Sequence, residues 1–386
     1  MAFRQQAGWT LKRVLGAFGA VAGIMAGLTT GLSGCASDKP KPTTLEPLAA
    51  KVAIELLWQS RVDSVEFPLS VGARDEQFAV ASTQGKVSII QSKSGQTVWS
   101  LDLGVPLQAA LGFNGRKAAA ITRDNDLVVA ELGRVLWRHR LPSKSTTAPV
   151  VAGGRVFVMT VNRVVHAFDA DSGHKLWTMD KPGDALTLAQ SGVVSTFENS
   201  LLVGQGPRLT ALDPDTGSVR WEAAIANPRG ANEVERLADL VGPSSRSGEI
   251  VCARAFQSAV GCVNAKRGQL LWSRNSGGWQ SVAGNDRVLV GADASDRITG
   301  WKAQTGEALW TQEKLLYRKL SGFVMSTGAV AVGDSEGRVH WLDPVSGDLI
   351  ARAETDGSAI ETPPVVTSGV LLVVTRKGGL FAFRAP

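Results

Sequence analysis

Side chains that could act in catalysis or bind a metal are few in this chain and scattered along it. The sequence has four histidines, and none is grouped with cysteine or aspartate at the spacing of a metal site. His166 and His340 occupy the same place in two copies of a repeat, which indicates a position on a strand. Aspartates recur with the turn of each repeat, and turn chemistry explains them. The sequence therefore gives only weak signals of catalysis or of a metal site.

Two of the three cysteines, Cys252 and Cys262, flank a predicted hairpin around Gln257 and Ser258. In an oxidising compartment such a pair favours a disulfide. A two-residue turn at 257–258 would set Cys262 opposite Ala253 and leave the cysteines on opposite faces. A three-residue turn centred on Gln257 would set the two cysteines opposite each other. We expect the disulfide, and the alternative is a pair of small buried hydrophobic side chains.

The third cysteine, Cys35, follows a segment typical of protein export. Basic residues near the start precede an uncharged apolar run over 14–32, which ends at Leu-Ser-Gly before the cysteine. This ending resembles the box of bacterial lipoproteins, in which the cysteine receives a diacylglyceryl group and becomes the mature N-terminus. The alternatives are an ordinary secretory peptide and a single membrane span, for which 19 residues is short. We expect residues 1–34 to be a lipoprotein signal peptide.

The residues after Cys35 predict a tether to a membrane. Aspartate in the next position favours the inner membrane in lipoproteins, so Ala36 implies the outer membrane. Residues 36–47 are polar, rich in proline and too poor in apolar side chains to fold. We expect residues 35–50 to be the lipidated N-terminus and a flexible tether. Acyl chains would then anchor the protein to the outer membrane, facing the periplasm.

The elements that carry these residues follow a repeat. The stretch DADSGHKLW (residues 169–177) closes one apolar run, turns at Gly173 and opens a second run with Trp177. At five further places a glycine is followed by tryptophan four residues later, and successive tryptophans lie 38, 40, 44, 51 and 38 residues apart. Gly347 keeps the turn, but Ala351 stands in place of the tryptophan. A period near 40 residues indicates one supersecondary unit repeated along the chain.

Each repeat has the composition of β-strands. In the unit that ends at Trp177, strand-forming runs cover 150–151, 156–161 and 164–168, with a tight turn at Asn162 and Arg163. The period leaves room for about four strands. A four-stranded sheet buries both faces only by stacking on its neighbours, and radial stacking gives a β-propeller. We expect an all-β fold of four-stranded antiparallel blades, with the tryptophans packed between sheets.

Eight blades account for residues 51–386. Seven glycine turns mark seven complete units, and two fragments are left over. One fragment is a strand with Trp58 that has no hairpin before it, and the other is the run GLFAFR (residues 379–384). Together they predict an eighth blade closed by N- and C-terminal strands, which removes the free edges of the ring. The alternative is seven blades with a loose N-terminal strand, but Trp58 precedes Trp99 by 41 residues, in phase with the repeat.

The charge of the chain does not indicate a nucleic-acid partner. The formal net charge is +6, and three of the positive residues belong to the predicted signal peptide. The sequence has no cluster of lysine and arginine with interleaved aromatic residues. We therefore expect no binding of nucleic acid.

Two stretches depart from the repeat. Residues 227–241 (NPRGANEVERLADLV) add about ten residues to the usual spacing and are charged and capable of forming a helix. Residues 184–188 (DALTL) alternate in polarity before the next strands. Loops that depart from a repeated scaffold often bind partners. The alternatives are a solvated insertion for the first stretch and an inner strand, with Leu186 and Leu188 in the core, for the second.

These motifs carry a resemblance to known families. The repeats AFDADSGHKLW (167–177) and ALDPDTGSVRW (211–221) resemble the pyrroloquinoline quinone repeat family of propellers. A narrower set looks like the BamB family, the propeller lipoproteins of the outer-membrane β-barrel assembly (BAM) machinery. That set comprises the lipoprotein box and the stretches GDSEGRVHWLDPVSG (333–347), LLYRKLSG (315–322) and ANEVERLADL (231–240).

The second resemblance implies a function and a site. It implies a non-enzymatic scaffold without a cofactor or metal, which docks on the periplasmic POTRA domains of the barrel subunit BamA. The scaffold would assist the folding and insertion of outer membrane proteins, which it could contact while they are unfolded. By motif, Leu186 and Leu188 match one docking loop of the family, and Asp239 matches part of the other. We add Glu235 and Arg236 of the second loop as candidate contacts. Two polar positions of the family are replaced here, by Ala189 and Val241.

Two other functions use the same fold. A quinone-dependent dehydrogenase is expected to carry a vicinal cysteine pair and a calcium site, and this chain has no Cys-Cys pair. A propeller that binds glycans needs exposed aromatic side chains. Three tryptophans lie outside the phase of the repeat and are candidates for that role: Trp279, Trp301 and Trp341.

Overall fold

The computed structural model describes residues 40–65, 71–181 and 186–384. The predicted signal peptide, the lipid site at Cys35 and the tether up to residue 39 lie outside the described residues, as do residues 184 and 185 of the DALTL stretch. Within the described ranges, no helix is both long and apolar enough to cross a membrane.

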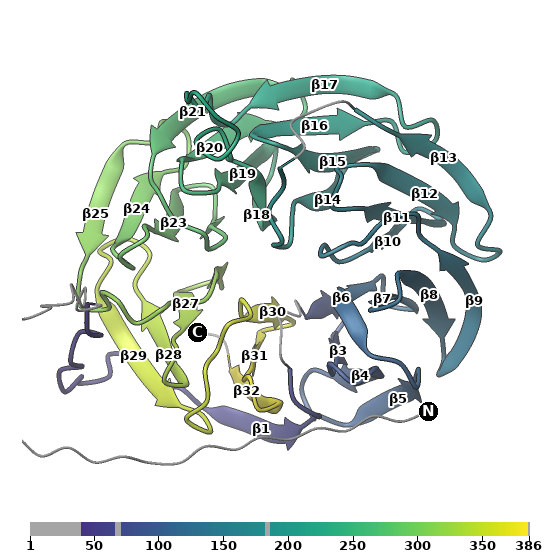
Figure 1. The fold of residues 1–386 in the computed structure, drawn as a ribbon. Coiled ribbons are helices and arrows are strands. Elements are labelled where there is room, and N and C mark those ends of the chain that lie inside the picture. Colours follow the sequence, from purple (N-terminus) through teal and green to yellow (C-terminus); the bar gives the residue numbers. More distant parts are fainter. Residues whose placement is uncertain (1–39, 66–70, 182–185, 385–386) are drawn as a thin grey trace, which may run out of the picture. The chain divides into compact units, whose positions relative to one another are not determined.

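The described strands form eight four-stranded antiparallel sheets, arranged as the blades of one ring (Figure 1). In seven of the blades the four strands follow one another in chain order. The predicted all-β, eight-bladed propeller is confirmed. For the repeat with Trp177, the predicted runs and the turn at Asn162 and Arg163 coincide with three of its four strands and the connection between two of them.

The first four blades have these strands. Blade 1 has β2 (Gly72–Arg74), β3 (Gln77–Ala81), β4 (Lys86–Gln91) and β5 (Thr97–Asp102). Blade 2 has β6 (Leu107–Phe113), β7 (Lys117–Thr122), β8 (Asp126–Glu131) and β9 (Arg134–Arg140). Blade 3 has β10 (Val150–Ala152), β11 (Arg155–Met159), β12 (Val165–Asp169) and β13 (Lys175–Met179). Blade 4 has β14 (Val194–Phe197), β15 (Ser200–Gln205), β16 (Arg208–Leu212) and β17 (Val219–Ala224).

The other four blades complete the ring. Blade 5 has β18 (Leu240–Ser247), β19 (Ile250–Ala255), β20 (Ala259–Asn264) and β21 (Gln269–Asn275). Blade 6 has β22 (Ala283–Gly284), β23 (Val288–Ala292), β24 (Ile298–Lys302) and β25 (Ala308–Gln312). Blade 7 has β26 (Phe323–Met325), β27 (Val330–Gly333), β28 (Arg338–Leu342) and β29 (Leu349–Glu354). Blade 8 has β30 (Val365–Thr367), β31 (Val370–Val374), β32 (Gly379–Arg384) and β1 (Leu56–Arg61).

Blade 8 is closed by the two ends of the propeller. Strand β1 pairs antiparallel with β32, and Trp58 lies opposite Ala382 in the register. The alternative of seven blades with a loose N-terminal strand is therefore wrong. Closure pairs the backbone of the last hairpin, whose outer edge would otherwise be exposed.

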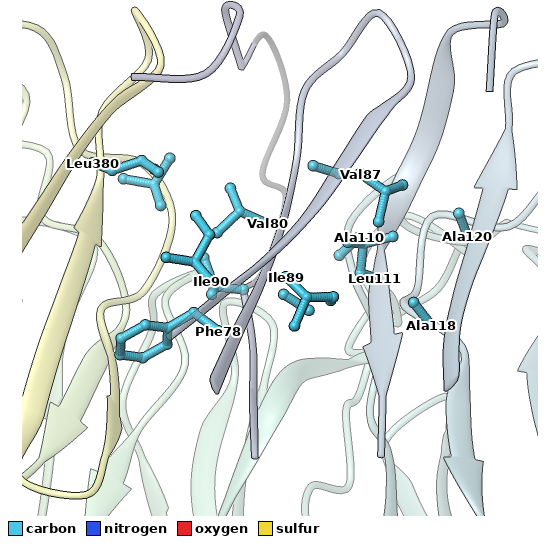
Figure 2. Packing of buried hydrophobic residues seen from close by; sticks show 14 of the residues in the cluster. Phe78, Val80, Val87, Ile89, Ile90, Ala110, Leu111, Ala118, Ala120 and Leu380 are labelled. Carbon is cyan, nitrogen blue, oxygen red and sulfur yellow. The ribbon is translucent and has the colours of Figure 1, made fainter. Parts of the chain in front are cut away.

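The core of the propeller lies between neighbouring blades. The middle strands are buried along most of their length because each sheet stacks on a sheet at either side. Figure 2 shows this for blade 1, where Phe78 and Ile90 point to the side of Leu380 in blade 8. Ile89, the neighbour of Ile90 on the same strand, points instead to the side of Leu111 in blade 2. Period-two alternation thus serves two interfaces, so both sides of a middle strand are apolar.

The tryptophans of the repeat join each outer strand to the following blade. Trp177 donates its indole N–H to the backbone oxygen of Pro214 at 3.0 Å. A Cβ atom on Gly217 would lie only 2.6 Å from the same indole ring, and Gly217 has a φ of 75°. Only glycine meets both conditions without strain. Comparable hydrogen bonds reach the next blade from four further tryptophans, namely Trp58, Trp137, Trp272 and Trp310.

The exception at Ala351 follows from this geometry. Ala351 lies on β29, and the next blade is blade 8, whose outer strands β32 and β1 come from opposite ends of the chain. No hairpin turn joins those two strands, so a tryptophan at this place would have no glycine turn to pack on. Ala351 is buried opposite Trp341, whose ring makes an edge contact with Phe383 of blade 8. In blade 7 the large aromatic side chain is thus on β28, as Trp341, and the small side chain of Ala351 is on β29.

The segment before β1 packs against blade 7. Arg318 donates to the backbone oxygen of Thr43 at 2.9 Å, and the amide of Thr43 donates to Leu316 at 3.0 Å. Leu45 and Leu48 pack against the apolar cluster between blades 6 and 7. The chain from residue 41 onward forms one compact unit with the propeller. The expectation of a free tether up to residue 50 is therefore wrong for residues 41–50. Leu45 and Leu48 pack on the propeller, and the segment accepts hydrogen bonds from Arg318 and Arg352.

The two cysteines of blade 5 lie opposite each other. The register pairs Cys252 with Cys262 and Ala255 with Ala259, which leaves a three-residue turn centred on Gln257. Their sulfur atoms are bonded, 1.99 Å apart. Of the two turns considered from the sequence, this is the one that brings the cysteines together.

We expect the mature protein to contain no free thiol. Thiol titration of denatured, unreduced protein should read near zero, and reduction should release two thiols, because Cys35 is expected to carry the lipid. Two reactive thiols before reduction would show that Cys252 and Cys262 are unbonded in solution. A Cys252→Ala variant is the matched control, since it should expose one thiol, that of Cys262.

Candidate docking site

The two stretches that depart from the repeat meet at one end of the ring. One lies between β13 and β14, and the other lies between β17 and β18. The turn between β11 and β12, which carries Arg163, is at the same end, because the strands of a blade alternate in direction. Three successive blades therefore contribute to one surface, from connections that are separate in the sequence.

Asp239 is the residue at which these connections join. Its Oδ1 accepts hydrogen bonds from Arg163, at 2.8 Å from Nη2 and 3.2 Å from Nε. Its Oδ2 accepts the backbone amide of Leu188 at 2.9 Å. Arg163 Nη2 also donates to the backbone oxygen of Leu186 at 3.0 Å. One ion pair thus fixes the backbone on both sides of Thr187.

The ion pair is largely shielded from solvent. The side chains of Arg163 and Asp239 are each only 15% exposed. Charge-assisted hydrogen bonds are shorter and stronger than neutral ones, and solvent screens them less when they are partly buried. Arg163 has a φ of 63°, which is uncommon for a residue with a Cβ and aims its side chain from the tight turn toward the next blade. The cluster is a clamp that holds the leucine segment.

Leu186 and Leu188 are half-buried side chains on a connection and do not belong to a strand. The inner strand of blade 4 begins only at Val194. The interpretation of residues 184–188 as an inner strand is therefore wrong for the described residues 186–188. The physical reason is that their backbone groups bind side chains of blade 3 and of the second connection instead of a neighbouring strand. Part of each leucine side chain therefore remains exposed and could contact a partner.

The charged stretch before β18 forms a single turn, not a helix. Asn232 Oδ1 accepts the amide of Glu235 at 2.9 Å, while Glu235 Oε2 accepts the amide of Ala231 at 2.7 Å. This reciprocal arrangement is similar to the box that caps helices, but the chain leaves it after one turn. Arg236 donates to the backbone oxygen of Gly230 at 3.3 Å. Glu235 and Arg236 therefore shape the loop as well as presenting charge.

The predicted limits of this stretch need correction. Leu240 and Val241 are buried residues of β18, and Val241 also bridges to Gly192. The loop therefore ends at Asp239. An acid in place of Val241 would lie at a buried position of this strand. The other replaced position, Ala189, is exposed.

A groove lined by charged side chains of both signs lies beside the clamp. Its volume is about 330 Å³, and it includes Leu186 and Leu237 in its lining. Its charged lining residues are Arg163, Lys181, Arg208, Arg236, Glu233 and Asp239. Partial burial raises the pKa of the nearby Glu222 carboxyl, but hydrogen bonds and charges from Lys181 and Arg208 outweigh this and lower it. Three of the four basic side chains are thus paired with acids of this protein, so the groove offers two leucines within a rim of mixed charge.

Arg163 is the residue of the candidate site that the sequence did not indicate. It lies 76 residues before Asp239 and is outside both irregular stretches. The only signal was the tight turn at Asn162 and Arg163, which is typical of any hairpin. The structure does bring together the residues that the sequence indicated at 186–188 and 239. The carboxylate of Glu235 instead accepts hydrogen bonds from residues of its own loop.

The tryptophans outside the repeat do not form an aromatic surface. Trp301 and Trp341 are buried, at 6% and 0% exposure. Trp279 is half-buried and lines a pocket with inner residues of four other blades. Of the three candidates for glycan binding, only Trp279 has an exposed part, since the other two tryptophans are core residues.

Polar clusters elsewhere have structural partners. Residues 333–337 match the Gly-x-Ser-x-Gly pattern of hydrolases, but they form the turn between β27 and β28. The hydroxyl of Ser335 donates to the backbone of Arg318 at 2.9 Å, while His340 contacts Asp334 at 2.9 Å. Burial lowers the pKa of His340, although Asp334 acts in the opposite direction. In the described part of the chain, no three His, Cys, Asp or Glu residues are grouped as metal ligands.

Comparison with known proteins gives consistent results. The family profile described as outer membrane protein assembly factor BamB matches residues 83–312 and 304–385. The protein of that name from Bordetella pertussis is 32% identical over 374 residues, covering 94% of this chain and 96% of its own. The crystal structure of BamB from Moraxella catarrhalis superposes with a TM-score of 0.78 at 22% identity, covering 86% of this chain and all of that one.

The fold is also shared with enzymes. The quinohemoprotein alcohol dehydrogenase from Comamonas testosteroni superposes with a TM-score of 0.66 at 14% identity, covering 86% of this chain and 77% of that one. At this identity the likeness concerns the fold alone.

Proposed function

The chain belongs to the BamB family of outer membrane protein assembly factors, and from this premise we propose that it is a non-enzymatic scaffold lipoprotein of the BAM complex. Its partner in this proposal is the periplasmic POTRA region of BamA, and its task is to assist the folding and insertion of outer membrane proteins. The docking surface comprises Leu186, Leu188 and the loop that ends at Asp239.

One observation carries the proposal of this docking surface. The leucine segment is clamped by Asp239 and Arg163 from two other connections, so a half-exposed apolar pair is held in one conformation. Pre-ordering of an anchor reduces the entropy lost on binding.

Co-purification tests the proposal as a whole. A tagged version should bring down the barrel subunit from membrane extracts of its own cells. The matched control is the tagged protein with Leu186→Ala and Leu188→Ala, which should lose that subunit while remaining folded. Capture of a dehydrogenase electron acceptor or of glycan alone would contradict the scaffold function.

We expect Cys35→Ala to release the protein from the outer membrane. Each buried CH₂ group of an acyl chain contributes about 0.8 kcal/mol, and the substitution removes all chains bound through this residue. Membrane fractionation in high salt measures the effect. The melting temperature of the propeller is the control and should not change, because residue 35 precedes the compact unit. Retention in the outer membrane would reveal a different anchor.

A further inference from the structure

The segment between the lipid site and the propeller is much shorter than the sequence alone predicts. Residues 41–50 are held on blade 7, as described above, so the chain belongs to the compact unit of the propeller from Lys41 onward. Only five residues lie between Cys35 and Lys41. An extended chain spans at most ~3.6 Å per residue, so the lipidated cysteine can reach only about 20 Å from this point. Free movement up to β1 would allow more than three times this distance.

The held segment begins beside one exposed loop. Thr43 bonds to Leu316, in the connection between β25 and β26. Arg318 of the same connection is buried, and it binds Thr43 in addition to Asp334 and Glu336. The point at which the chain leaves the propeller is therefore fixed by a buried arginine, and the loop at residues 313–319 lies next to it.

Hydrogen bonds to a buried aspartate fix the backbone conformation of this loop. Buried Asp296 accepts the backbone amides of Lys319 at 2.6 Å and Leu320 at 3.2 Å. Tyr317 and Lys319 have positive φ angles of 58° and 53°. Non-glycine residues adopt such angles only when their surroundings enforce them. The loop consequently turns Tyr317 outward, and this side chain is 38% exposed.

The exposed side chains of the loop are Glu313, which pairs with Arg297, and three residues that suit a lipid surface. Tyr317 is the single tyrosine of the chain, and Lys314 and Lys319 flank it as exposed residues. Tyrosine is enriched at the boundary between lipid and water, and lysines beside it are attracted to anionic headgroups. Lys314 also lies 3.6 Å from Glu46 of the held segment, so loop and segment form one surface.

We propose that the loop at residues 313–319 is a membrane-contact surface, which rests on the lipid headgroups to which the acylated Cys35 is anchored. The inference rests on the lipid anchor of the proposed function and deepens it by giving the ring an orientation. This loop and the clamp of Arg163 and Asp239 are at the same end of the strands, but the loop joins blades 6 and 7, whereas the clamp spans blades 3 to 5 (Figure 1). Contact through blade 7 places the docking site away from the point of anchorage.

Lipid quenching of a fluorophore tests the orientation. Tyr317→Cys and Val345→Cys are made in the full-length lipoprotein, labelled without reduction and reconstituted in vesicles of phosphatidylethanolamine and phosphatidylglycerol with a nitroxide on some headgroups. Val345 is the matched control, because it is 75% exposed on the same blade but in the turn between β28 and β29, at the other end of the strands. We expect a severalfold greater loss of fluorescence at position 317. Equal quenching, or stronger quenching at 345, overturns the proposal.

A second variant tests whether the held segment sets this orientation. Leu45→Ser with Leu48→Ser removes its apolar contacts and leaves the strands intact. The quenching at position 317 should then fall toward the level at 345, and unchanged quenching would overturn the role of the segment. Mass spectrometry and flotation report the anchor separately. Absence of the lipid would refute the anchor and the orientation together, whereas a lipidated, floating protein with equal quenching refutes the orientation alone.

Discussion

Trp177→Ala is expected to lower the free energy of unfolding by about 3–5 kcal/mol, because it leaves a cavity between blades 3 and 4. The side chain is 9% exposed, and the substitution also removes the hydrogen bond from its indole to Pro214. The backbone oxygen of Pro214 would then have to find water at the edge of the cavity. Chemical denaturation, followed by the loss of strand signal in circular dichroism, measures the change.

The neighbouring residue provides the control. Leu176 lies on the same strand and is 46% exposed, so Leu176→Ala should change stability by less than about 0.5 kcal/mol. A second variant, Gly217→Ala, attacks the same contact from the other blade, because its Cβ would meet the indole ring. It should also destabilise the protein. Equal stability of all three variants and the parent would contradict the role of the tryptophan as the joint between blades.

The sequence predicted the fold because the glycine and tryptophan that pack between blades are close together in the sequence. Glycine and tryptophan lie four residues apart in one hairpin, although each contacts a different neighbouring blade. The spacing was therefore visible without knowledge of the partner. Even the exception at Ala351 had a cause in the ring, since blade 8 lacks the hairpin turn that would receive a tryptophan.

The candidate site was visible only in part. The stretches that contain Leu186, Leu188 and Asp239 stood out because they depart from the repeat, and the resemblance to the BamB family selected these three residues. Their arrangement could not be predicted, because it depends on bonds from side chains to backbone groups across three connections. Nothing in the residues around Arg163 distinguishes it from an ordinary turn. The packing of residues 41–50 was missed for a related reason, since their partners Arg318 and Arg352 lie about 300 residues later.

The clamp makes a specific result expected at the docking site. Leu186→Ala with Leu188→Ala should weaken capture of the periplasmic domains of the barrel subunit at least tenfold, or about 1.4 kcal/mol. The melting temperature should barely move, because both side chains are only half-buried and the backbone bonds to Asp239 and Arg163 remain. Capture assays with purified partner domains and thermal unfolding of the same preparations measure the two effects.

Variants of the clamp separate anchoring from positioning. Asp239→Asn should weaken capture although both leucines are present, because the segment loses its charged hydrogen bonds and becomes mobile. Arg163→Ala should act in the same way, and the double substitution should cost less than the sum of the two, as expected for residues that act through one contact. Leu309→Ala, on the outer strand of blade 6 and 50% exposed, is the control and should bind normally. If the leucine variant loses folding together with binding, the two leucines belong to the core. If it folds and binds fully, the barrel subunit docks on another part of the ring.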